Sequence, residues 1–113
     1  MKKIYSFFLA LVFCGLSLIG KSQTVIEVKY ATDADVLLFA TDSLSADVIV
    51  YQYSSADSAT GNTGRWYFTA FANEASKRVF YVGTSSAAQL NIFFTSNPQA
   101  AGWINTSKSS LMN

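Results

Sequence analysis

The sequence predicts an all-β protein, built as a compact closed array of six or seven short strands from repeats of about 13 residues. Three observations predict this fold class. Alanines recur at a nearly constant interval, an apolar residue followed by an aromatic one stands at the same place in each interval, and Ser, Asp, Gly and Asn bound the apolar segments. Because no single repeat can bury its apolar face alone, neighbouring repeats are expected to pack into one continuous core.

The first segment, residues 1–22, has the pattern of a secretory signal peptide. Met1-Lys2-Lys3 is basic, residues 4–19 are almost wholly apolar, and Gly20 and Ser22 suit cleavage before Gln23. The apolar run is shorter than the about 20 residues of a membrane-spanning helix, so a retained anchor is the less favoured alternative. We expect a secreted or periplasmic protein, with residues 23–113 as a single repeat-built β domain and no membrane span after processing.

Processing also changes the chemistry of the chain. The single cysteine, Cys14, leaves with the leader, so stability must come from packing rather than from a disulfide. The full chain has eight basic and seven acidic residues, a net charge of +1; without Lys2, Lys3 and Lys21 five basic residues remain, and the net charge becomes −2. Nucleic acid and anionic membrane are therefore not expected as partners.

The repeat is counted from the alanines at its joints. Successive joint alanines are 12, 13, 16, 13 and 13 residues apart, at Ala34, Ala46, Ala59, Ala75, Ala88 and Ala101. The long interval contains residues 61–64, Gly-Asn-Thr-Gly, a composition that turns a chain. A sixth, truncated unit begins near Thr24. Since only a small residue recurs at the joints, we expect the chain to pass close to another segment there.

Two columns of side chains repeat within the units. The inner column is apolar and comprises Leu38, Val50, Trp66, Val79 and Ile92, and each is followed by an aromatic residue, namely Phe39, Tyr51, Tyr67, Phe80 and Phe93. The residues two positions after the inner column share its face and are Ala40, Gln52, Phe68, Tyr81 and Phe94. These segments read as strands, whose successive residues point to opposite faces. We expect the inner column to form the deeper core, and the aromatic column to be buried centrally behind a polar rim.

Groups for catalysis are scarce. The chain has no histidine, and its serines stand in connections where turn chemistry explains them. We therefore predict no catalytic residues, no cofactor and no metal site. The joint aspartates follow the spacing of the repeat rather than that of an ion-binding loop, so capping of backbone amides is favoured over calcium; they are Asp33, Asp35, Asp42, Asp47 and Asp57.

Four residues are candidates for surface binding: Asn62, Arg65 and Trp103 lie where the repetition breaks, and Tyr67 could form an aromatic platform with Trp66 and Trp103. Large aromatic residues with a polar atom favour interfaces with proteins or glycans. The alternative for the tryptophans is packing, with Trp66 in the inner column and Trp103 closing the end of the array. The partner itself is not predicted beyond a protein or glycan surface.

The order of these motifs resembles the septoil-knot family of small bacterial proteins. The resemblance is carried by the aromatic-centred strands, the Ala-Asp joints, residues 61–68 and the ending 101–108, and it spans Thr24 to Met112. It implies a compact β-rich ring whose backbone traces a torus knot with seven crossings, a rare exception to the rule that connections do not thread one another. It implies no activity, substrate or catalytic residue. The joints at Ala75 and Ala88 are followed by Ser76 and Gln89 instead of Asp, which speaks against a role for a repeated acidic ladder.

These observations favour a secreted or periplasmic, non-enzymatic structural or binding module. One alternative is a small extracellular hydrolase that uses carboxylate or Ser-Lys chemistry. Another is a self-associating cell-surface protein, because low charge and repeated β segments permit strands of different molecules to pair.

Overall fold

The computed structural model describes residues 23–113, so the predicted signal peptide lies outside the described residues. Seven strands form one sheet, which confirms the all-β fold class. Their bounds are β1 Thr24–Glu27, β2 Val36–Ala40, β3 Val48–Tyr53, β4 Arg65–Phe68, β5 Lys77–Tyr81, β6 Leu90–Phe94 and β7 Gly102–Trp103. Every residue of the predicted inner column lies in a strand, and the truncated first unit does begin at Thr24.

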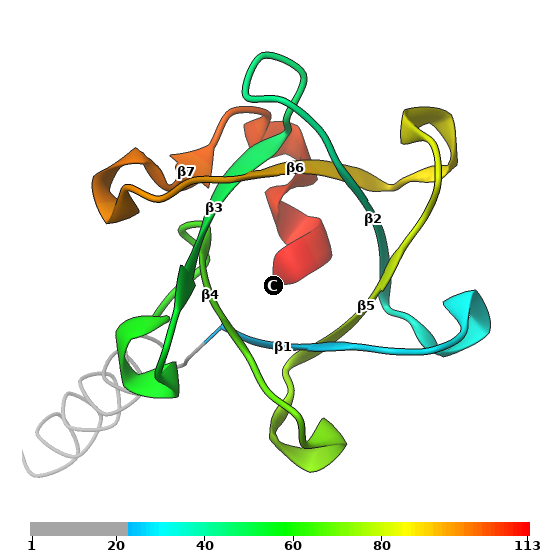
Figure 1. The fold of residues 1–113 in the computed structure, drawn as a ribbon, viewed down its shortest axis with the longest axis vertical. Helices are drawn as coiled ribbons and strands as arrows, with labels where there is room; N and C mark the ends of the chain where they lie inside the picture. The colour runs from blue at the N-terminus through cyan, green and yellow to red at the C-terminus, as the bar shows by residue number, and fades with distance from the viewer. Residues whose placement is uncertain (1–22) are drawn as a thin grey trace, which may run out of the picture.

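Six of the strands close into a parallel barrel. Around the ring the order is β1, β5, β2, β6, β3 and β4, and β4 pairs with β1 again. Figure 1 views this ring along its axis. The short strand β7 lies outside the ring order and pairs antiparallel with the start of β3. Since β1 to β6 each pair on both sides, the ring has no free strand edge.

The chain passes around this ring twice. The first circuit places β1, β2 and β3 at alternate positions, and β4, β5 and β6 then occupy the gaps between them. Only the step from β3 to β4 joins neighbouring strands, and this step contains the long repeat interval. The break in the repeat at residues 61–64 therefore marks the start of the second circuit.

Gly64 is the tightest point of that step. Its φ is +80°, in the left-handed region, and a Cβ there would collide with the Ile49 carbonyl oxygen and lie 2.8 Å from the Gly102 amide nitrogen. Only glycine has neither the backbone penalty nor the side chain that this position excludes.

Five single-turn 3₁₀ helices project from the ring in the connections (Figure 1). They are η1 Ala31–Asp33, η2 Ala56–Ser58, η3 Ala72–Glu74, η4 Ser85–Ala87 and η5 Pro98–Ala100. Five of the six joint alanines are the residues that end these turns, and Ala46 and Ala59 are buried as expected for a close approach.

The barrel interior is filled in layers, because alternate residues of each strand point inward. The middle layer takes one fully buried residue from each of the six strands: Val25, Leu38, Val50, Trp66, Val79 and Ile92. Five of these are the predicted inner column, which is thereby confirmed as the deeper core. The aromatic column lies on the outer face and is only partly buried, so the expectation that these rings are buried was wrong: in the described residues no second layer of strands or helices covers the outside of the ring.

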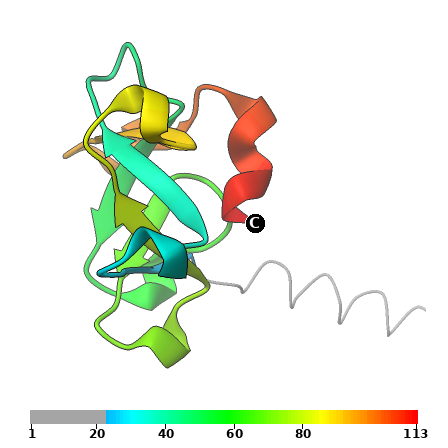
Figure 2. The same cartoon turned by 90° about the vertical axis from the view of Figure 1, so that its right-hand side faces the viewer.

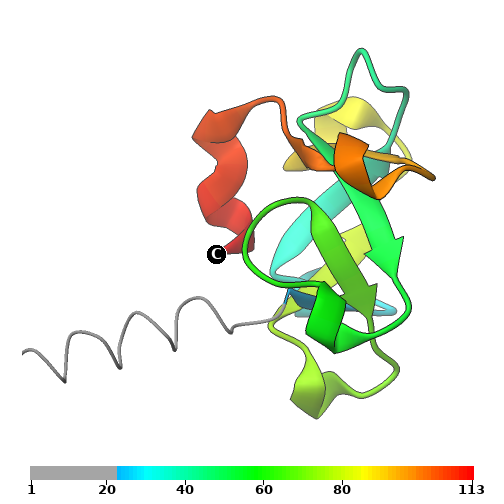
Figure 3. The same ribbon diagram turned by 90° about the vertical axis from the view of Figure 1, so that its left-hand side faces the viewer.

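The end of the barrel at which the strands begin is covered. The last element, η6 (Thr106–Met112), lies against this end of the ring (Figures 2 and 3). Met112 is 1% exposed within the core cluster, and the Gln23 side-chain amide donates to its carbonyl oxygen at 2.9 Å. The residue that closes the array is thus Met112, while Trp103 packs partly buried against the core. Within residues 23–113 no helix is long and apolar enough to span a membrane.

Candidate functional site

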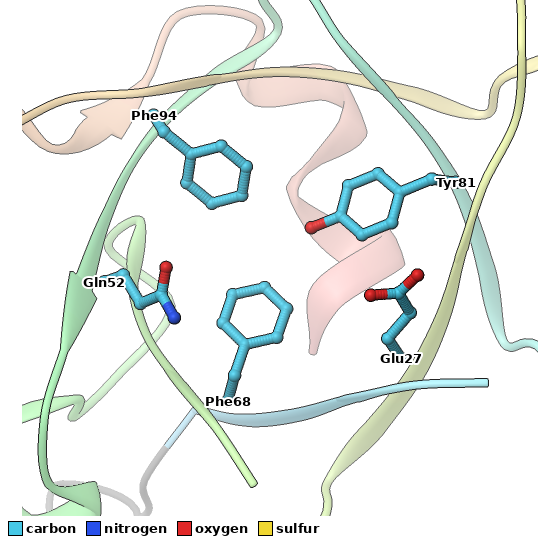
Figure 4. Close-up of a pocket in the computed structure, with 5 residues that line it drawn as sticks. All are labelled: Glu27, Gln52, Phe68, Tyr81 and Phe94. Atoms are coloured by element: carbon cyan, nitrogen blue, oxygen red, sulfur yellow. The ribbon is translucent and has the colours of Figure 1, made fainter.

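The opposite end of the barrel, where the parallel strands finish, holds a hollow of about 370 Å³. We call this hollow the mouth. Its lining comes from five of the six barrel strands: Glu27, Gln52, Phe68, Tyr81 and Phe94 (Figure 4). All five stand two positions after a middle-layer residue, so they form the third inward layer. Since parallel strands all finish at one end, their last inward residues necessarily meet there.

Aromatic rings make up the apolar part of the mouth. The ring centroids of Phe68 and Phe94 are 6.2 Å apart, with the ring planes tilted by 52°. Phe68 in turn packs on Trp66 in the layer below, at 6.1 Å between centroids. Trp66 is fully buried, and its indole N–H has no acceptor within the described residues. Because the two ring planes are tilted, Phe68 and Phe94 do not form one flat platform.

Three polar groups point into the same space. Figure 4 shows the Glu27 carboxylate, the Gln52 amide and the Tyr81 hydroxyl directed toward its centre. Among residues 23–113, none of these three groups has a hydrogen-bond or ion-pair partner. Glu27 and Gln52 are solvent-exposed and Tyr81 is partly buried, so these groups are available to a small molecule that enters the hollow.

The electrostatics of the mouth are set by Glu27. The described ion pairs join Arg78 to Asp35 and Lys108 to Asp47, so the Glu27 carboxylate carries its charge without a cation beside it. Burial, and then the Glu27 charge, raise the pKa of Tyr81 to about 12. The phenol is therefore neutral at physiological pH, and Figure 4 shows its O–H group directed into the hollow.

The predicted surface residues divide into two places. Asn62 and Trp103 contact each other, since the Trp103 indole N–H donates to the Asn62 backbone and side-chain oxygens at 3.1 Å. The Asn62 amide also donates to the Ser109 carbonyl of η6 at 2.8 Å, which places this pair at the covered end. Arg65 and Tyr67 lie on the outer face of β4, both half-buried. Neither place is part of the mouth.

Three of the five joint aspartates cap backbone amides, as predicted, and no such bond is seen for Asp33 among the described residues. Carboxylate oxygens of Asp35, Asp42 and Asp47 accept from the amides of Arg78, Ser45 and Asn91, each at 2.9 Å. No group of three or more potential metal ligands occurs within residues 23–113. The side chain of Asp57 lies outside the described set.

Asp47 has the most partners of these aspartates. Besides the Asn91 amide, it accepts from Lys108 Nζ at 3.2 Å and from Asn105 Nδ2 at 3.4 Å. Burial opposes ionisation of this carboxyl, but the Asn91 amide, Lys108 and Asn105 together hold its pKa below the ordinary value. Asp47 therefore links the start of β3 to β6 and to the C-terminal segment.

Sequence reasoning did not identify the mouth. The signal was present two positions after the inner column. The residue type there changes from unit to unit, while the inner column stays apolar and the next position stays aromatic. Glu27 was hidden because its unit is truncated. A position that varies where its neighbours repeat is not fixed by the packing that conserves the other two columns within this chain.

Comparison with known proteins identifies a family but no individual relative. A family model described as the 7(1) septoil knot domain matches residues 22–104. Neither the curated proteins nor the solved structures gave a match.

Proposed function

Since the chain belongs to the septoil knot domain family, whose description names a fold and no activity, we propose a function from the site alone. The protein is a non-enzymatic binding module, exported by its N-terminal leader, and the mouth is its ligand site. One observation carries the proposal: a carboxylate, an amide and a phenol without protein partners converge with two further aromatic rings on one hollow.

The scaffold suits a preformed binding site. A closed ring with a filled middle layer fixes the backbone positions of all five lining residues, and Trp66 supports Phe68 from below. Ligands bind more tightly to groups that need no ordering on association. The covered far end also leaves the mouth as the accessible end of the barrel interior.

The two alternatives fit the mouth less well. Glycoside hydrolysis by carboxylates generally uses a pair of such groups flanking the bond that breaks, and Glu27 is the one carboxylate in the lining. Ser-Lys chemistry needs a serine and a lysine, and neither residue type lines the mouth. Self-association by strand pairing requires free edges, and in the described residues this leaves the two-residue strand β7. A single small-molecule site is therefore the simpler proposal.

The test is a fragment screen by NMR on the purified protein, with amines, sugars, amino acids, carboxylic acids and neutral aromatic compounds. We expect the backbone amide shifts that respond to cluster at the ends of β1 and β3 to β6. Shifts confined to the Asn62–Trp103 pair, or no response to any fragment, would overturn the assignment. Turnover of ester, peptide or glycoside substrates that Glu27→Gln abolishes would replace it by the hydrolase.

Export is tested separately from binding. The mass of the protein recovered from its native compartment is expected to correspond to a chain that begins at Gln23. Recovery of the uncleaved chain in the membrane fraction would contradict export by a cleaved leader.

A further inference from the structure

The mouth is described above as a site for a small molecule, and its chemistry narrows the class of ligand. Resting on that proposed function, we propose that the ligand is a small organic cation, whose positively charged nitrogen carries alkyl substituents. The head group of choline and the side-chain end of lysine share this chemistry.

The charge of the mouth is the first step. Glu27 is the one formally charged group in the lining, and within the described residues no lysine or arginine pairs with it. An unpaired carboxylate beside an apolar hollow repels anions and is stabilised by an incoming cation. Anionic ligands such as phosphates or carboxylic acids are thereby disfavoured.

The aromatic rings are the second step. Phe68, Tyr81 and Phe94 come from three different strands and surround the space that Glu27 faces (Figure 4). Ring faces carry partial negative charge and attract an alkylated ammonium, which also buries its carbon atoms against them. Because its phenol is neutral at physiological pH, Tyr81 adds an aromatic ring and a hydroxyl dipole and no second negative charge.

Shape and size distinguish this ligand from a sugar. A sugar ring stacks on a flat aromatic surface, whereas the planes of Phe68 and Phe94 are tilted by 52°. The volume of about 370 Å³ is near the lower end of the about 300–1,000 Å³ of small-molecule pockets. A compact head group fits such a space better than an oligosaccharide does.

The test measures the affinity of choline for the purified protein by calorimetry. The control ligand is the neutral analogue of choline, in which carbon replaces the nitrogen, because it has the same shape without the charge. The second arm uses Nα-acetyl-lysine amide, which keeps its charged ε-ammonium group, and its neutral analogue is Nα-acetyl-norleucine amide. Whichever of the two cations binds more tightly identifies the source of the head group. We expect choline or the lysine amide to bind at least about tenfold more tightly than its neutral analogue, which corresponds to about 1.4 kcal/mol.

Matched variants locate the effect. Glu27→Gln is expected to weaken binding of the cation about tenfold and to leave the neutral analogue unchanged, while Asp33→Asn, which removes an equal charge from η1, changes neither. Phe94→Leu keeps an apolar side chain but removes the aromatic ring. It is expected to weaken binding of the cation more than binding of the neutral analogue. Phe71→Leu, at an exposed ring outside the mouth, is its control.

The outcomes separate the ligand class from the site itself. Equal affinity for the charged and neutral compounds, or mouth shifts produced by sugars alone, overturns the organic cation and leaves the mouth as a ligand site. No mouth response to any compound of the NMR screen overturns both. A folded Glu27→Gln variant, checked by circular dichroism, that binds the cation as tightly as the parent protein also refutes the proposal.

Discussion

Asp47 is predicted to be the side chain through which the barrel holds its C-terminal segment. Replacing it by alanine leaves the Asn91 backbone N–H without its hydrogen-bond acceptor. A partly buried N–H without an acceptor lowers stability by about 1–3 kcal/mol. The Lys108 pair is partly exposed, with 36% of the lysine side chain accessible, so solvent screening limits its contribution to at most about 1 kcal/mol. We therefore expect Asp47→Ala to lower the free energy of unfolding by about 1–4 kcal/mol.

The matched control is Asp35→Ala, at the equivalent joint. Asp35 also caps a backbone amide, but its carboxylate and its Arg78 partner are 39% and 55% exposed, so water replaces part of what is lost. We expect the control to cost less than about 1 kcal/mol. Urea unfolding of both variants measures the difference. Equal midpoints for the two variants would refute the role given to Asp47.

The same carboxylate predicts an acid dependence with a definite sign. Because the pKa of Asp47 is lower in the folded protein than the ordinary 3.8, its contribution is present above that pH and is lost as pH falls through the folded pKa. Stability of the parent protein should therefore decline on acidification below about pH 4. Asp47→Ala should show a shallower decline, measured by urea unfolding across the same pH range, and an unchanged slope would contradict the assignment.

Three further predictions concern the turn at Gly64, the plug and the mouth. Gly64→Ala should destabilise by more than about 2 kcal/mol, since it combines a left-handed φ with a backbone collision, whereas Gly83→Ala, where a Cβ meets nothing within 4 Å, should change the melting temperature little. Met112→Ala should cost about 2–5 kcal/mol in urea unfolding and more than Leu111→Ala, because Met112 is fully buried and Leu111 is not. Tyr81 should titrate near pH 12 by phenolate absorbance, and Glu27→Gln should lower this value without returning it to 10, because burial is the larger cause. The contribution of the neutral Tyr81 phenol to stability is fully present below pH 10 and is lost as pH rises through about 12. Titration of Tyr81 near pH 10 in the parent protein would contradict the burial of its ring.

Much of the fold is predictable from this sequence, because core packing and hydrogen bonding of backbone amides explain the residues that repeat. The inner column at Leu38, Val50 and Val79 had to be apolar to fill the barrel, and it is fully buried. The short aspartate side chains at the joints had to satisfy backbone amides, and Asp35 and Asp47 do so. These are local or nearest-neighbour requirements, and they leave a regular pattern in the chain.

The path around the ring does not follow from the same pattern. Interleaving of the two circuits depends on which strands pair over long sequence distances. Each repeat has the same local preferences whether the strands follow one another around the ring or interleave, so the sequence pattern does not distinguish these two strand orders. The break at residues 61–64 is the sequence trace of the second circuit, but its meaning becomes clear only from the pairing of β3 with β4. The seven-crossing knot implied by the family resemblance stays a prediction.

The mouth was not predicted, because its residues do not repeat along the chain. Its five residues share no chemical type, and they meet only because parallel strands in a closed ring finish at one end. Asn62 and Trp103, which stood out as departures from the repeat, hydrogen-bond to each other and, through Asn62, to η6 at the covered end. Whether they also bind a partner stays a prediction.

The most direct measurement of the ligand site is the set of intermolecular NOEs between the methyl protons of choline and the aromatic protons of the purified protein. Binding in the mouth predicts NOEs to Phe68, Tyr81 and Phe94, and their loss in Glu27→Gln at the same choline concentration. NOEs to exposed rings outside the mouth, such as Tyr30 or Phe71, or NOEs that persist unchanged in Glu27→Gln, would contradict it.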